Sequence, residues 1–148
     1  MRGHIGGKTF HGLIVWQKAI ALTRQVYAAS RTMPSSEKFG LIAQMRRSAV
    51  SIPSNIAEGN ARQSMPDYLR FLMMARGSLA ELETQVIIAR ELRMLAETES
   101  ILSAIHEVRR ILQGLITSLR KKQVPQNPPS RKDCPRTDTH SSRSIRRT

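Results

Sequence analysis

The residues best placed for chemistry lie in one stretch, Ser48 to Gly59, which reads SAVSIPSNIAEG. Ser51, Asn55 and Glu58 recur there at steps of four and three, so they form one polar line along a helix. Such a line could hold a ligand or give Glu58 a catalytic role, but no second titratable residue accompanies it. Because buried polar groups are normally paired, we favour a structural network in which Asn55 and Glu58 bind backbone groups and Arg62 or Arg46.

Two arginines directly before this stretch extend the same network. Arg46 and Arg47 are adjacent, so on a helix they point about 100° apart, and one can pack while the other faces outward. We expect one of them to form an ion pair with Glu81 or Glu83, and the other remains compatible with phosphate binding. The residues predicted for the structural polar network are Ser51, Asn55, Glu58, Glu81 and Glu83.

The chain carries a large surplus of positive charge. Its 148 residues include 24 Lys and Arg against 11 Asp and Glu, a formal net charge of +13, and residues 1–122 alone carry 18 against 9. A surplus of this size favours polyanionic partners, and the planar guanidinium of arginine suits phosphate. The candidate nucleic-acid-binding residues are Lys18, Arg24, Arg46, Arg47, Arg62, Arg70, Arg76, Arg109, Arg110, Arg120, Lys121 and Lys122.

The sequence shows no other chemical signature. The four histidines are dispersed, and there is no serine elbow, phosphate-binding loop or dinucleotide fingerprint, so we predict no metal, no cofactor and no enzymatic activity. The single cysteine, Cys134, indicates a reducing cytoplasm. No apolar run is long enough for a membrane span, and no signal peptide is expected at the N-terminus. The few aromatic residues resemble packing residues, which disfavours a protein that stacks on single strands.

Four helices must position these side chains. Apolar spacing predicts a first helix from Leu13 to about Arg31, a second that begins in the connection Met33–Glu37 and runs to Glu58, a third over 65–96 and a fourth over 97–122. Ser64 is the predicted N-cap of the third helix. Pro53 should kink the second helix near Val50 without ending it, and Gly59 should follow its end as a C′ residue.

The predicted core stripes follow from steps of three and four. In chain order they are Trp16, Ala19, Ile20, Thr23, Val26 and Tyr27; Ile42, Met45, Ala49, Ile52 and Ile56; Tyr68, Leu72, Ala75, Leu79, Leu82, Val86 and Ala89; and Ile101, Ile105, Val108, Leu112, Leu115 and Leu119.

Small and apolar residues off these stripes raise two further expectations. Gly77 and Ser78 predict close approach of another helix near Pro53. A second apolar stripe indicates either self-association or a wide core face, and the sequence leaves both open. Its residues are Met73, Ala80, Ile87, Ile88, Leu102, Ile111 and Ile116.

The predicted fold is therefore all-α, an antiparallel up-down-up-down four-helix bundle over residues 12–122. Residues 1–11 are expected to form a flexible leader. Residues 123–148 are rich in proline and basic residues with few large apolar ones, and they are expected to form a disordered tail.

Several motifs, in this order, resemble a known family. WQKA at 16–19, QMRRSA at 44–49, SIPSNIAEG at 51–59 and GSLAELE at 77–83 resemble the bacterial four-helix-bundle proteins encoded in 23S rRNA intervening sequences, over roughly residues 10–119. The resemblance implies a ring-like homo-oligomer, a pentamer. The family is also similar in fold to the accessory variability protein of diversity-generating retroelements, which works with a reverse transcriptase and binds nucleic acid.

Two functional hypotheses follow. The first is a non-enzymatic homo-oligomeric bundle that binds RNA or DNA through basic surfaces, mainly by phosphate contacts. The second is an oligomeric protein-interaction scaffold, for example for a reverse transcriptase, in which the charge serves solubility or an acidic protein surface.

Overall fold

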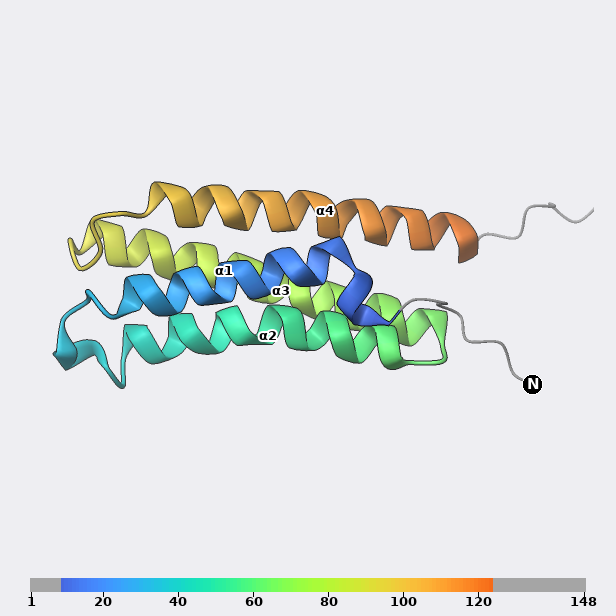
Figure 1. The fold of residues 1–148 in the computed structure, drawn as a ribbon, viewed down its shortest axis with the longest axis horizontal. Coiled ribbons are helices and arrows are strands. Elements are labelled where there is room, and N and C mark those ends of the chain that lie inside the picture. Colours follow the sequence, from blue (N-terminus) through green and yellow to red (C-terminus); the bar gives the residue numbers. More distant parts are fainter. Residues whose placement is uncertain (1–8, 124–148) are drawn as a thin grey trace, which may run out of the picture.

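The computed structural model describes residues 9–123, which form four long helices. These are α1 (Ile14–Ser30), α2 (Leu41–Ala61), α3 (Met65–Glu91) and α4 (Glu99–Gln123), with short 3₁₀ turns η1 (Phe10–Gly12) and η2 (Ser35–Glu37). Successive helices run in opposite directions (Figure 1). The predicted all-α antiparallel bundle is therefore confirmed. The predicted tail from residue 124 onward, and the first eight residues of the predicted leader, lie outside the described residues.

The helices enclose one apolar core. α1 contacts α2 and α4, and α3 contacts α2 and α4, so the four helices close into a square, with the most extensive contact between α2 and α3. The stripes predicted for the second helix and, apart from the half-buried Tyr68, for the third are confirmed as buried.

Gly59 allows α2 and α3 to lie close together. It is a buried residue inside α2, its φ is not positive, and a Cβ added to it would lie 2.8 Å from the Cβ of Phe71 and 3.2 Å from the carbonyl oxygen of Tyr68. The prediction that Gly59 follows the helix end was wrong, because α2 continues to Ala61. The glycine is needed for interhelical contact, which local sequence cannot distinguish from a helix stop.

Gly77 shows the opposite situation. It is exposed, and a Cβ added there would have no neighbour within 4 Å, so the expected close approach at this glycine was wrong. Its neighbour Ser78 is the residue that faces α2, with its hydroxyl 2.9 Å from that of Ser51. Gly77 and Ser78 together predicted a close contact with another helix, and of the two only Ser78 makes it.

Pro53 lies inside α2, as predicted, and the helix continues past it. A proline has no N–H, so the carbonyl of Ala49 lacks its normal helical donor. The hydroxyl of Thr23, in α1, lies 2.9 Å from that carbonyl and also 2.9 Å from the carbonyl of Ala19. Because Ala19 has a backbone donor in its own helix, the single hydroxyl proton can serve Ala49. The Thr23 hydroxyl of α1 thus donates the hydrogen bond that Pro53 cannot donate within α2.

Two predicted stripes need correction. In α1 the buried residues are Val15, Ala19, Leu22, Val26 and Ser30, whereas Trp16, Ile20 and Thr23 are half-buried and Tyr27 is exposed. Apolar residues cover a wide arc of α1, so periodicity alone did not show which residues form the centre of its buried face. In α4, Ile116 is buried and Leu115 only half-buried, because a straight helix drifts from a strict seven-residue repeat.

The second apolar stripe divides in the structure. Ile116 belongs to the core, Met73, Leu102 and Ile111 are half-buried against it, and Ala80, Ile87 and Ile88 are exposed on α3. A wide core face accounts for the α4 residues, while Ile87 and Ile88 of α3 remain 36% and 41% exposed.

The helix ends differ partly from those expected. Ser64 caps α3 as predicted, accepting a hydrogen bond from the Asp67 N–H at 3.4 Å. α3 ends at Glu91, five residues earlier than predicted, and Arg93 adopts a left-handed conformation with φ of 55°. The N–H of Met94 then donates to the carbonyl of Ala89 at 2.8 Å. This is a Schellman ending with arginine in the position usually held by glycine.

The aromatic residues are not all packing residues. Trp16, with its ring centroid 5.3 Å from those of Phe10 and His11, holds η1 against α1, so the chain is already folded before the end of the predicted leader. Phe39, in contrast, is 89% exposed, and its assignment as a packing residue was wrong. It lies in the loop between α1 and α2, where no other helix covers it.

We expect Gly59→Ala to lower the free energy of unfolding by about 1–3 kcal/mol, because the new methyl group overlaps rigid atoms of α3. Denaturation in urea followed by circular dichroism, at one protein concentration, measures this change. Gly77→Ala is the matched control and should stabilise by about 0.5–1 kcal/mol through helix propensity alone. A stabilising effect of Gly59→Ala would contradict the close-contact interpretation.

We expect Thr23→Val to lower the free energy of unfolding by about 1–3 kcal/mol, because it leaves the Ala49 carbonyl unpaired. In a Pro53→Ala background the backbone regains its N–H, and the cost of Thr23→Val should fall by about 1 kcal/mol. The four urea denaturation curves of this double-mutant cycle give the coupling directly. Equal costs of Thr23→Val in the two backgrounds would show that Thr23 does not serve the proline defect.

Candidate nucleic-acid interface

The predicted basic residues are distributed over all four helices, and several of them are neutralised by carboxylates. Lys18 lies 3.0 Å from Glu107, Arg62 lies 2.6 Å from Glu58, Arg70 lies 3.7 Å from Asp67, and Arg109 pairs with Glu83. The guanidinium groups of Arg62 and Arg70 also lie 4.8 Å from the centre of the Phe71 ring. These two arginines therefore have structural contacts in addition to their charge.

Arg46 and Arg47 do not form the expected ion pair. Within residues 9–123, neither lies within 4 Å of a carboxylate oxygen of Glu81 or Glu83. Arg46 instead donates to the Ser30 hydroxyl at 2.9 Å and covers the Tyr27 ring at 4.8 Å, which joins α2 to α1. Arg47 is exposed. The expectation that one packs and the other faces outward is confirmed, with different partners.

The predicted polar network is divided among separate contacts. Asn55 donates to the Ser51 carbonyl at 2.8 Å and to its hydroxyl at 2.9 Å, and Ser51 in turn meets Ser78 across the helix contact. Glu58 is outside this network and pairs with Arg62, one of its two expected partners. Glu81 lies at 3.5 Å from the Ser48 hydroxyl. The network therefore joins α2 to α3.

Glu83 is the main acidic group on the α3–α4 face. Its carboxylate accepts from Arg109 and lies 2.7 Å from His106 Nε2, both on α4. The hydrogen bond from Arg109, followed by that from His106, lowers the pKa of this carboxyl. Glu83 was one of two predicted partners, with Glu81, for one arginine of α2, but the antiparallel packing places it against α4 instead.

A basic groove lies beside this pair, between α3 and α4. It is lined by Arg76, His106, Arg109, Arg110 and Gln113. Arg76 donates to Gln113 Oε1 at 3.2 Å, which is a neutral partner. His106 and Gln113 were missed as candidates, although their steps from Arg109 and Arg110 place all four on one helical line. The groove thus gathers three predicted arginines with two residues that sequence reasoning passed over.

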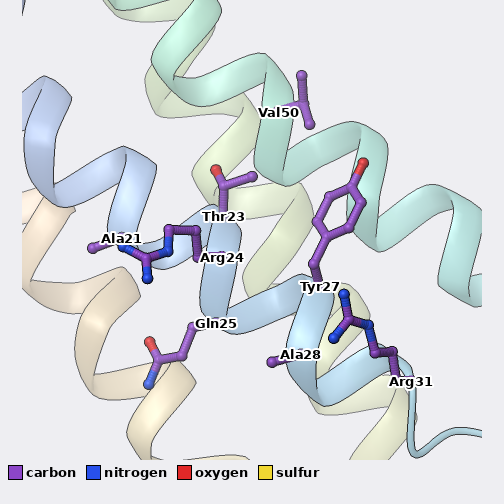
Figure 2. A pocket seen from close by; sticks show the side chains of 8 residues that line it. All are labelled: Ala21, Thr23, Arg24, Gln25, Tyr27, Ala28, Arg31 and Val50. Carbon is purple, nitrogen blue, oxygen red and sulfur yellow. The ribbon is translucent and has the colours of Figure 1, made fainter.

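A second hollow lies on the outer surface of α1 (Figure 2). It is lined by Arg24 and Arg31 together with Thr23, Tyr27 and neighbouring residues of α1, and by Val50 of α2. Arg31 was not among the predicted candidates. The remaining candidates, Arg120, Lys121 and Lys122, are exposed at the end of α4, where Arg120 lies 3.7 Å from the sulfur of Met73.

The described residues show neither a metal-binding cluster nor a membrane span. Within 9–123, no three His, Cys, Asp or Glu side chains are grouped so that they could hold an ion. Over the same part of the chain, no helix has the length and apolar character needed to cross a bilayer.

Comparisons with known proteins agree with this architecture. The chain matches the model of the 23S rRNA-intervening sequence protein family over residues 11–114. It is similar in structure, with a TM-score of 0.66 and 22% identity, to a protein of unknown function from the S23 ribosomal protein family of Bacteroides thetaiotaomicron. The alignment covers 74% of this chain and 99% of that one. At this identity the similarity extends to the fold alone. No curated protein matches the chain.

The Glu83 contacts predict a pH-dependent contribution to stability. A lowered folded-state pKa means that this stabilisation is present above the ordinary glutamate pKa of 4.5 and is lost as the pH falls through the lowered value. Wild-type protein should therefore lose more unfolding free energy than Glu83→Gln on acidification below pH 4.5, as measured by urea denaturation. Glu97→Gln, at an exposed acid, is the control and should follow the wild-type profile. Parallel profiles for wild type and Glu83→Gln would contradict the assignment.

Proposed function

Since the chain belongs to the 23S rRNA-intervening sequence protein family, we propose that it is a non-enzymatic, homo-oligomeric four-helix bundle that binds RNA or DNA through basic surfaces, mainly by phosphate contacts. The family match confirms the resemblance found in the motifs. The family name refers to a position in a ribosomal RNA and describes no activity. The proposal therefore rests on the surface of the bundle.

The observation that carries the proposal is the number of cations without a carboxylate partner. Residues 9–123 contain 16 Lys and Arg against 9 Asp and Glu, and six of the nine carboxylates already lie within 4 Å of a basic side chain. Eleven cations of this region have no such partner: Arg24, Arg31, Lys38, Arg46, Arg47, Arg76, Arg93, Arg110, Arg120, Lys121 and Lys122.

These unpaired cations favour a polyanion for a physical reason. A phosphate backbone releases its condensed counterions when basic side chains replace them, and this release supplies affinity without sequence specificity. Self-association would repeat each basic surface, so that weak contacts add through multivalency. The exposed Ile87 and Ile88 of α3 support self-association, and a pentamer is the assembly that the family resemblance implies.

The second candidate function is a protein-interaction scaffold, for example for a reverse transcriptase. Its supporting observation is exposed apolar surface in two loops, where Phe39 is 89% and Leu92 is 58% exposed. The loops between α1 and α2 and between α3 and α4 lie at the same end of the bundle (Figure 1). Under either function we place the protein in the cytoplasm, with no cofactor and no membrane association.

The proposed function predicts binding that survives removal of the residues beyond α4. Fluorescence anisotropy with labelled RNA and duplex DNA, over a salt series, should show binding by the full chain and by a chain ending at Gln123. For duplex DNA, the logarithm of the binding constant should fall with the logarithm of salt by about 0.9 for each phosphate that the protein neutralises.

Disappearance of all binding when residues 124–148 are removed would contradict a role for the folded basic surfaces and would favour the scaffold. Sedimentation of the same two proteins shows whether the assembly is intact, so that weaker binding is not confused with dissociation of subunits.

A further inference from the structure

We infer that the groove between α3 and α4 is the phosphate-binding site of this chain. We also infer that Glu83 competes with phosphate for the basic side chains of this groove. The inference rests on the proposed function and assigns it to one site. The ligand is a phosphodiester backbone, bound independently of base sequence. The groove is lined by Arg76, His106, Arg109, Arg110 and Gln113.

The first argument is that two cations of the groove, one of them positioned by a hydrogen bond, have no carboxylate partner within residues 9–123. Arg76 is half-buried and is held by Gln113, a neutral amide, whose own Nε2 donates to Thr117 at 3.4 Å. Its guanidinium is therefore oriented without losing its charge to a carboxylate. Arg110 is exposed and has no hydrogen bond or ion pair within residues 9–123. Positioned arginines lose less side-chain entropy when they bind an anion.

The second argument concerns Glu83, which does not line the groove but pairs with two of the side chains that do. Glu83 holds Arg109 and His106 from across the helix contact. This arrangement orients both side chains toward the groove, but its negative charge repels an approaching phosphate and occupies their donors. A phosphate that enters must share or displace the Glu83 carboxylate. Removing that charge should therefore strengthen polyanion binding, whereas a purely structural Glu83 would give no such gain.

The third argument is the length and composition of the surface. Arg109 and Arg120 are eleven residues apart, which corresponds to about 16 Å along α4. A nucleic-acid strand carries one charge per ~3.4 Å of helix axis in a duplex, so this length can meet several phosphates. No Phe, Tyr or Trp side chain lines the groove, so it lacks the large aromatic platforms on which single-strand binders stack bases. The contacts available are those of a backbone, which carry no sequence information.

The hollow on α1 lacks these features. Arg24 and Arg31 lie beside the partly exposed Tyr27 and Val50, and neither arginine has an orienting hydrogen bond within the described residues (Figure 2). The groove between α3 and α4 and the hollow on α1 both carry arginines, so charge alone does not distinguish them. They differ because Arg76 and Arg109 are held in position by hydrogen bonds.

The test compares charge-matched variants of the full chain by anisotropy with a labelled oligouridylate and a labelled duplex DNA across a salt series. Arg76→Gln with Arg110→Gln removes two charges from the groove. Arg31→Gln with Lys38→Gln removes two exposed charges from the connection between α1 and α2. Circular dichroism and sedimentation verify that each variant keeps the fold and the assembly of the wild type.

We expect the groove variant to weaken oligouridylate binding about tenfold or more. The slope of log K against log salt should become shallower by about 1.4, because each lost contact between a cation and a phosphate of a single strand lowers the slope by ~0.7. The charge-matched control should weaken binding less than about threefold. Glu83→Gln should strengthen binding several-fold, and a mixed-sequence single strand should bind like oligouridylate.

Equal weakening by the two double variants would overturn the assignment of the site while leaving nucleic-acid binding intact. Unchanged or weaker binding by Glu83→Gln would overturn its competition with phosphate. If the wild-type chain binds neither probe even at low salt, the proposed function itself fails.

Discussion

The close contact between α2 and α3 is the constraint on which the rest of the bundle depends. It requires a glycine at position 59, where the Cβ of Phe71 leaves no room for a side chain, and small polar residues at the contact of Ser51 with Ser78. Close approach brings backbone and hydroxyl groups within hydrogen-bonding distance, so burial does not leave them unpaired. The contact fixes the register of the two helices and, through it, the faces that α1 and α4 can cover.

The proline in α2 is compatible with this packing because a neighbouring helix supplies what it removes. The Thr23 hydroxyl reaches the carbonyl that Pro53 leaves without a donor. The hydrogen bond missing from α2 is therefore replaced by a specific hydrogen bond between α1 and α2. Arg46 adds a second polar connection between the same helices through Ser30 and the ring of Tyr27. The conspicuous motif of the sequence is thus explained by helix packing.

The same packing decides where positive charge remains. Carboxylates neutralise Arg62, Arg70 and Lys18 locally, and Phe71 holds the first two by their guanidinium groups. Arg76 instead receives a neutral partner from α4. Net charge describes the attraction of the whole chain for a polyanion, whereas the choice of partner for each arginine determines where that attraction is concentrated. In the proposed function, Arg76 and Arg110 would serve binding, whereas Arg62, Arg70 and Lys18 serve stability through their carboxylate partners.

The sequence by itself determined the helical class, the antiparallel order, the N-cap of α3 at Ser64 and most core positions of α2 and α3. Apolar periodicity and capping act over a few residues, so local sequence is enough to predict them. Only the tertiary structure decided the role of Gly59, the partners of Arg46 and Glu83, and the burial of Ile116 over Leu115. Each of these depends on atoms contributed by another helix, and the distance between helices is not encoded in local spacing. His106 and Gln113 were missed as residues of the proposed groove for the same reason. The sequence showed that they share a helical line with Arg109 and Arg110, but not that Arg76 of α3 lies opposite them.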